Sequence, residues 1–192
     1  MAIQKVLLFL FLHIQVLNIV AQLPDLRYRS CDNYGFYYDS IGQNTDEVSG
    51  IVLCRGDVEL KECRSCIHNA AQKLVQLCPT QKEVIGGYDE CLLHYSNLSI
   101  INTQSLSVQY FRRNTVNASN PRNLTRNWCT PDLSPQNCLT DAYGTMPQCP
   151  CLGKRGGRII GPRCNFRYES YRFFVDVPLD APPPADEMVC KY

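Results

Sequence analysis

The chain has 192 residues, 45% of them hydrophobic, with 12 cysteines and 19 basic against 18 acidic residues. This composition is typical of a globular protein and excludes a disordered or fibrous chain. A net charge of +1 provides no electrostatic field that would hold a polyanion, so we expect no nucleic-acid partner.

Residues 1–21 predict a cleaved secretory signal peptide. Lys5 precedes a dense apolar stretch, and the small residue Ala21 suits signal peptidase. A membrane anchor is the alternative, but polar residues interrupt the apolar run that a membrane helix needs. No later stretch is long and apolar enough to span a bilayer. We therefore expect a secreted, extracellular protein with no transmembrane span after cleavage, whose cysteines form disulfides.

The first repeat, residues 22–101, is expected to combine one helix with short strands. Over residues 59–78, cysteines and apolar residues recur at three-and-four spacing and Pro79 follows, which indicates an amphipathic helix. Short apolar or alternating segments predict strands over residues 48–54, 83–85 and 91–95.

The cysteine spacing of this repeat recurs in residues 128–178. Eight residues separate Cys54 from Cys63 and also Cys129 from Cys138, and twelve separate Cys78 from Cys91 and also Cys151 from Cys164. This pattern indicates a tandem duplication. Each repeat is too small for its core alone to stabilise it, so disulfides must supply much of the stability.

Between the repeats, residues 102–127 are polar and lack apolar periodicity, which predicts an exposed connection. Sequons at Asn97, Asn117 and Asn123 predict N-glycosylation on the secretory route. Residues 179–192 are expected to form a Pro-rich tail.

Several motifs together resemble the plant ginkbilobin-homologous, or stress-antifungal, domain. They are the cysteine triplet of residues 54–66 and the segments YDECLLHYSN (88–97), CTPDLSPQNC (129–138) and GKRGGRIIGPRCNFRYESYRFF (153–174). The resemblance covers most of residues 27–178. It implies an α+β fold of two tandem, disulfide-stapled modules, each an antiparallel sheet packed on a helix.

The resemblance also implies disulfide pairs: Cys31 with Cys78, Cys54 with Cys63, Cys66 with Cys91, and Cys129 with Cys138. Half a zinc site at residues 63–66 is the alternative, but the sequence lacks a matching second pair of ligands. We expect no metal and no cofactor. The remaining cysteines can pair in three ways if they pair among themselves: Cys149, Cys151, Cys164 and Cys190. An unpaired Cys190 would link two chains as a disulfide dimer.

Both modules are shortened relative to the family. The interval from Cys31 to Cys54 is too short for the helix that family members usually place there, and the third motif cysteine is missing after Cys138. Gly144 and Pro147 weaken the second predicted helix. These departures leave open that the chain is a degenerate, truncated relative of a working protein.

A mannose-type glycan site is the functional expectation that the resemblance carries. Some antifungal members bind mannose through an Asn after the N-terminal cysteine, an Arg six residues before the last cysteine and a Glu five residues after it. In the second repeat Arg158 and Glu169 hold the last two positions relative to Cys164, so two of the three positions match; in the first repeat Asp32, rather than Asn, follows Cys31. A guanidinium and a carboxylate bind vicinal hydroxyls well, and nearby aromatic residues could cover a sugar ring: Tyr168, Tyr171 and Phe173.

The alternative is that Arg158 and Glu169 form a cross-strand ion pair on a solvated face. In the first repeat the same positions hold Ile85 and Ser96, so it should not bind sugar in this mode.

The sequence gives catalysis little support. After the signal peptide, His68 and His94 are the only histidines, and no Ser-His-Asp order or nucleophile elbow occurs. We expect a secreted apoplastic stress or defence protein that is antifungal or binds carbohydrate. The alternative is a soluble fragment like the ectodomain of a cysteine-rich receptor-like kinase, acting in signalling with a cell-surface receptor as partner. Residues 181–184 resemble the spacer before the membrane helix of such receptors.

Overall fold

The computed structural model describes residues 27–28, 35–44, 47–101, 110–118, 124–174 and 187–190, with the backbone alone for residues 27–28, 126 and 187–190. The expected signal peptide, Cys31 and Asp32 lie outside these residues. The chain divides into two compact units, one of residues 1–29, 33–102 and 182–192 and the other of residues 30–32 and 103–181.

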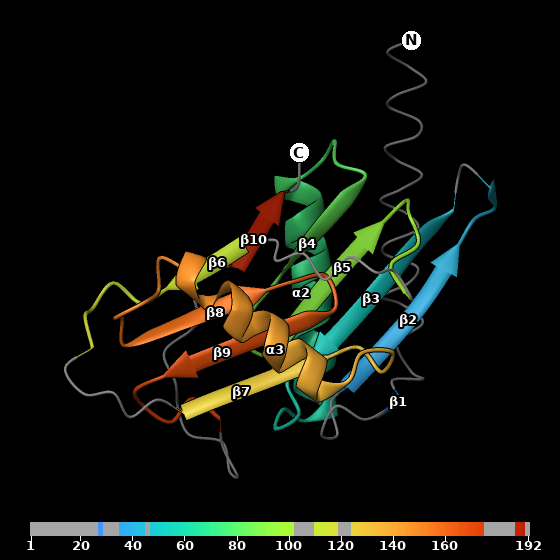
Figure 1. Cartoon of the computed structure of the whole chain (residues 1–192). Coiled ribbons are helices and arrows are strands. Elements are labelled where there is room, and N and C mark those ends of the chain that lie inside the picture. Colours follow the sequence, from blue (N-terminus) through green and yellow to red (C-terminus); the bar gives the residue numbers. More distant parts are fainter. Residues whose placement is uncertain are drawn as a thin grey trace. The chain divides into compact units, whose positions relative to one another are not determined.

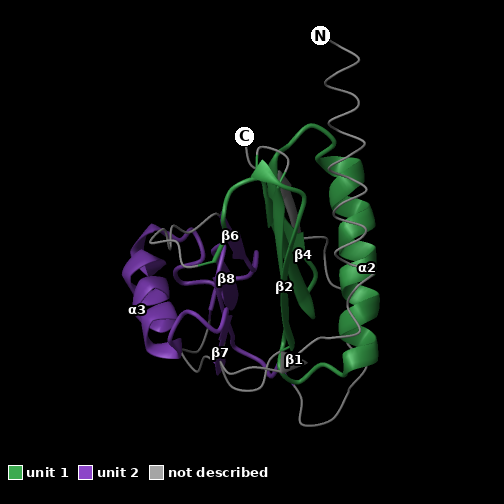
Figure 2. Cartoon of the chain, turned by 90° about the vertical axis from the view of Figure 1, so that its right-hand side faces the viewer, with its two compact units in different colours: residues 1–29, 33–102, 182–192 green, residues 30–32, 103–181 purple. Residues whose placement is uncertain are grey.

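The first unit is an antiparallel sheet with helix α2 (Leu60–Leu77) along one face (Figures 1 and 2). Its strand order is β1-β2-β3-β5-β4-β10. The strands are β1 (Arg27–Tyr28), β2 (Gly35–Ile41), β3 (Val48–Cys54), β4 (Glu83–Gly87), β5 (Cys91–Ser96) and β10 (Glu187–Cys190).

Helix α2 forms where the three-and-four spacing predicted it. Its buried residues are Cys63, Cys66, Ile67, Ala70, Ala71 and Leu74. They pack with alternate residues of β3, β4 and β5, such as Val52, Val84 and Leu93. The helix ends at Leu77, and the Cys78 N–H donates to the Leu74 carbonyl, 2.8 Å away. Because the buried stripe includes Cys63 and Cys66, the helix is joined covalently to the sheet that it covers.

The second unit repeats this arrangement with a four-stranded antiparallel sheet of order β6-β8-β9-β7. The strands are β6 (Tyr110–Arg113), β7 (Leu124–Cys129), β8 (Gly156–Ile160) and β9 (Cys164–Glu169). Helix α3 (Pro135–Thr145) begins with Pro135 in its first turn and with the Ser134 hydroxyl accepting from the Asn137 N–H. It is followed by the short helix η3 (Met146–Gln148).

The two units share one register, which confirms the duplication. Cys54 lies opposite Cys91 between β3 and β5, and Cys129 lies opposite Cys164 between β7 and β9. The strand order β3-β5-β4-β10 of the first unit therefore corresponds to β7-β9-β8-β6 of the second.

Two segments differ from the expectation. The expected connection of residues 102–127 contains β6 and most of β7, and the expected tail contains β10, which pairs with β4. These strands show no clear alternation of apolar and polar residues that would identify them in the sequence. The neighbouring strand, which supplies their hydrogen bonds, decides their structure.

Candidate functional site

The two predicted sugar-binding residues lie on one face of the second sheet. Ile159, Phe166 and Tyr168 point toward the core that includes Ala142 of α3. Since side chains alternate along a strand, Arg158 and Glu169 occupy the opposite face. Both are buried, with 3% and 7% of their surface exposed.

Arginines from three neighbouring strands meet in register on this face. Arg158 of β8 lies opposite Arg112 of β6 on one side and opposite Arg167 of β9 on the other. The Arg158 guanidinium stacks over the ring of Trp128 of β7, 5.3 Å from its centroid. Arg167 stacks in the same way over Phe173, at 4.4 Å.

Glu169 forms its ion pair with Arg167. Nε and Nη2 of Arg167 each donate to Glu169 Oε1 at 3.1 Å, and both side chains are more than nine-tenths buried. In the register, Glu169 lies opposite Gly156 rather than Arg158. The alternative of a cross-strand ion pair between Arg158 and Glu169 stays a prediction. The motif CNFRYE indicates the contact between Arg167 and Glu169, because the two residues are two positions apart in a strand and so share a face.

Two of the three glycines in the GKRGGR segment, Gly156 and Gly157, leave room for neighbouring side chains. A Cβ at Gly156 would collide with the Glu169 carboxylate, and a Cβ at Gly157 would lie 2.5 Å from Cys151 Cβ. The second half of the segment begins strand β8. Gly156 and Gly157 therefore serve close packing between strands and against the core.

The three aromatic residues expected around a sugar are dispersed. Tyr168 lies on the face that packs toward α3, and its hydroxyl donates to the Cys151 carbonyl at 2.5 Å. Burial, and secondarily the charge of Glu169, raise the pKa of Tyr168. Tyr171 is exposed, and Phe173 contacts Arg167 and Phe174.

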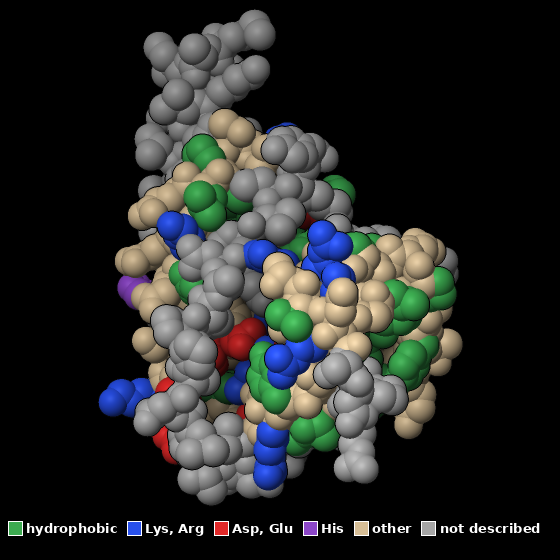
Figure 3. Space-filling model, turned by 90° about the vertical axis from the view of Figure 1, so that its left-hand side faces the viewer, with side chains coloured by type: hydrophobic (Ala, Val, Ile, Leu, Met, Phe, Trp, Pro, Cys, Tyr) green, Lys and Arg blue, Asp and Glu red, His purple; other side chains and the backbone are tan. Residues whose placement is uncertain are grey.

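Charged side chains elsewhere in each unit also form ion pairs. Arg55 binds Asp57 in the first unit, and Arg163 binds Asp132 in the second, at 2.6 and 2.5 Å. His94 is buried, with Nε2 3.3 Å from Glu83 Oε1. Figure 3 shows basic side chains scattered over one face with acidic ones between them, rather than gathered into one patch.

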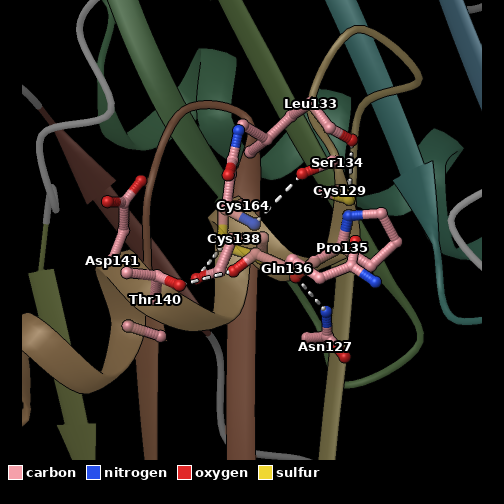
Figure 4. The surroundings of a disulfide bond; sticks show 12 residues. Asn127, Cys129, Leu133, Ser134, Pro135, Gln136, Cys138, Thr140, Asp141 and Cys164 are labelled. Atoms are coloured by element: carbon pink, nitrogen blue, oxygen red, sulfur yellow. Dashed lines mark hydrogen bonds between the residues drawn. A yellow bond between two sulfur atoms is a disulfide. The ribbon is translucent and has the colours of Figure 1, made fainter.

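Disulfides join each helix to its sheet. Cys54 bonds Cys63 and Cys66 bonds Cys91, which confirms two expected pairs. In the second unit Cys138 of α3 bonds Cys164 of β9, with Cα atoms 5.5 Å apart (Figure 4). The expected bond from Cys129 to Cys138 is wrong, because Cys138 takes the position that Cys66 holds in the first unit.

The other cysteines of the second unit differ from the first. Cys149 bonds Cys151, across one intervening residue. Cys78 and Cys129 are also disulfide-bonded. The expected bond of Cys31 and the expected dimer contact of Cys190 lie outside the described side chains.

The sequons differ in their surroundings. Asn97 is half-buried after β5. Asn117 is exposed, and its Oδ1 accepts from Lys154 Nζ at 2.6 Å. Asn123 lies outside the described residues.

The residues that the structure describes contain neither a membrane-spanning helix nor a cluster of metal ligands. No helix there is long and apolar enough to cross a membrane. No three side chains among His, Cys, Asp and Glu gather there as ligands for a metal ion.

Comparison with known proteins relates the chain to plant cysteine-rich proteins. The family model for salt stress response/antifungal proteins matches residues 13–98. Cysteine-rich repeat secretory protein 38 of Arabidopsis thaliana is 32% identical, over 72% of this chain and 71% of that protein. An antimicrobial ginkbilobin-2-like protein of Castanea crenata is also 32% identical, over 72% of this chain and 73% of its own.

Receptors of the same kind match a smaller share of their own length. Cysteine-rich receptor-like protein kinase 7 of Arabidopsis thaliana is 31% identical over 87% of this chain, which spans 32% of the kinase. The fold resembles the tandem DUF26 ectodomain of the Arabidopsis thaliana cysteine-rich receptor-like protein PDLP8, with a TM-score of 0.62. That match has 18% identity and covers 80% of this chain and 85% of the ectodomain.

Proposed function

Since the chain belongs to the salt stress response/antifungal family, we propose that it is a secreted, non-catalytic recognition protein of the plant cell exterior that acts in stress or defence. The observation that carries the proposal is the set of disulfides joining α2 and α3 to their sheets. Such bonds form and persist in oxidising compartments, and small α+β units of this size depend on them.

The alternative is a signalling role like that of a receptor ectodomain. It is supported by the match to a receptor-like kinase, which covers 87% of this chain but only 32% of the kinase. In that case the partner is a cell-surface receptor rather than a fungal or wall component.

The two roles are separated by testing the secreted full chain directly. Protein recovered from the apoplast is assayed for inhibition of fungal growth, with reduced and alkylated protein as the matched control. The defence proposal predicts inhibition that depends on intact disulfides. If native and reduced protein are equally inactive, and the native chain is instead retained by plant plasma membranes, the signalling role is favoured.

Carbohydrate binding through Arg158 and Glu169 is the finer hypothesis. The position of both side chains on one face of the second sheet supports it. The burial of both groups opposes it, as does the hydrogen bond that Arg167 donates to Glu169 Oε1. The hypothesis predicts saturable binding of a mannose oligosaccharide that Arg158→Ala and Glu169→Ala both abolish. If titration calorimetry detects no binding to the folded native chain, these residues are structural, which is the outcome that we expect.

A further inference from the structure

The near-neutral net charge of the chain conceals an uneven distribution of charged residues. Residues 103–181, which form most of the second unit, include 10 basic and 5 acidic residues. Residues 22–102 and 182–192 include 8 basic and 13 acidic residues. The second unit therefore carries an excess of positive charge that the total of +1 does not reveal, and its own field attracts anions.

Four basic residues of the second unit lie at one end of its sheet, and we call them the basic rim: Arg113, Lys154, Arg155 and Arg172. Strand β6 ends at Arg113, and β8 begins directly after Arg155. Since β8 runs antiparallel to both β6 and β9, its start lies beside the ends of those two strands. Arg172 follows three residues after the end of β9. Between them, the Ser170 N–H donates to the Arg155 carbonyl at 2.7 Å, which holds this segment beside the start of β8.

The basic rim is open to solvent, unlike the buried arginines of the same unit. Three of its side chains are exposed and Lys154 is half-buried. By contrast, Arg158, Arg163 and Arg167 are buried. Neighbouring strands lie about 4.8 Å apart, so a row across β6, β8 and β9 extends over roughly 10 Å. The rim is therefore a row of separate cations rather than a compact pocket.

Three cations of the rim form no ion pair with any carboxylate that the structure describes: Arg113, Lys154 and Arg155. Lys154 Nζ donates to the Asn117 amide oxygen at 2.6 Å, and Arg155 Nε donates to the Ser170 hydroxyl at 3.3 Å. Glu169, at the same end of the sheet, is buried and binds Arg167. None of these contacts supplies a counter-charge to the three cations, so they can bind an external anion.

We propose that the basic rim binds an acidic polysaccharide whose rings carry carboxylates, of the polygalacturonate type. This inference rests on the proposed function, because a protein of the plant cell exterior meets the acidic polysaccharides of the wall. A guanidinium binds a carboxylate through two parallel hydrogen bonds. A polymer with a carboxylate on each ring can contact the whole row of cations at once. Tyr171, which is 45% exposed and precedes Arg172, offers an aromatic face to a sugar ring.

The surroundings of the rim favour a flexible polymer over a membrane. Asn117, whose Oδ1 accepts from Lys154, belongs to an expected N-glycosylation sequon. A glycan at this position is bulky and hydrophilic, so it would hold a flat bilayer away from the rim. A single polysaccharide chain can pass beside it.

The test measures binding of the secreted full chain to polygalacturonate by titration calorimetry at several salt concentrations. The rim variant combines three substitutions: Arg113→Gln, Lys154→Gln and Arg155→Gln. A matched control removes the same charge from exposed side chains of the first unit: Lys61→Gln, Arg64→Gln and Lys82→Gln. We expect the rim variant to bind about tenfold or more weakly and the control to bind within about twofold of the native chain. Native binding should weaken as salt rises.

Methyl-esterified polygalacturonate, which has lost its carboxylate charge, tests the native chain without any substitution and should not bind. Far-ultraviolet circular dichroism must show that both variants fold like the native chain. The proposal is overturned if the native chain does not bind at low salt, if the rim variant and the control bind equally well, or if the esterified polymer binds equally well. Stronger binding to phosphatidylcholine vesicles that contain anionic phosphatidylglycerol also overturns it, because the rim would then serve a membrane.

These results are separate from the test of the proposed function. A chain that inhibits fungal growth but does not bind polygalacturonate overturns the proposal for the rim alone. A chain that binds polygalacturonate through the rim and does not inhibit fungal growth supports the rim and contradicts the defence role.

Discussion

The Arg167 guanidinium binds one oxygen of the Glu169 carboxylate through both Nε and Nη2, on the face of the second sheet that carries Arg158. This pair uses two residues of one strand and is almost completely buried. The positions expected for a sugar therefore lie in a buried cluster of charges and aromatic rings.

Removing one member of this pair should be costly. Arg167→Met leaves the Glu169 carboxylate buried without its main counter-charge, so we expect a loss of about 3 kcal/mol in the free energy of unfolding, measured in urea. The double variant Arg167→Met, Glu169→Leu should recover part of this loss, because it removes the buried carboxylate together with its Arg167 partner. Equal stability of Arg167→Met and the native chain would show that the pair is solvated.

The glycine opposite Glu169 provides a test of close packing. Gly156→Ala places a methyl group in the space of the Glu169 carboxylate, which Arg167 holds in position. We expect a cost of about 1–3 kcal/mol. Gly144→Ala is the matched control: it lies in α3 with open space around it, and should stabilise the chain by about 1 kcal/mol. Similar effects of the two substitutions would contradict this account of GKRGGR.

Two disulfides of the second unit should contribute differently to the free energy of unfolding. The Cys138–Cys164 bond joins residues 26 apart, and the Cys149–Cys151 bond joins residues two apart. Loop entropy predicts stabilisation of about 3.5 kcal/mol for the first and about 1.5 kcal/mol for the second. Denaturation of the two double alanine variants compares them directly. A larger loss from the Cys149–Cys151 variant would mean that chain entropy does not set the order.

Tyr95 should make the first unit sensitive to alkali. Burial raises the pKa of this tyrosine from 10.0 to about 12. The unfolded chain loses the phenol proton first, so the stability that comes from the neutral phenol is complete below pH 10 and is lost as pH rises toward 12. We expect a loss of about 2–3 kcal/mol across this range. Tyr95→Phe should flatten the profile measured by urea unfolding, whereas an unchanged slope would assign the effect to other groups.

The sequence predicted those parts of the fold that bury a periodic apolar stripe. Helix α2 and strands β3, β4 and β5 lie within a few residues of the expected ranges, because their cysteines and aliphatic residues recur at the helical or strand period. Strands β6 and β10 were not predicted. Their short segments, YFRR and EMVC, carry no such period, and pairing with β8 and β4 determines their conformation.

The candidate site was predictable in its position but not in its contacts. Counting from Cys164 placed Arg158 and Glu169 on adjacent strands of one face, as the structure has them. The contacts depend on the register, in which Arg158 lies opposite Arg167 and Glu169 lies opposite Gly156. The disulfide of Cys138 was not predictable either. The third motif cysteine is absent, and Cys138 bonds Cys164 in its place. Spacing alone could not distinguish this bond from a bond to Cys129.

Disulfide mapping by mass spectrometry tests the central claim most directly, which is that each unit is an α+β module whose helix is bonded to its own sheet. The full chain is secreted through an oxidising pathway and digested without reduction. The account predicts linked peptides for Cys54–Cys63, Cys66–Cys91 and Cys138–Cys164. A linked peptide joining Cys129 to Cys138, or free thiol at Cys164, would contradict it.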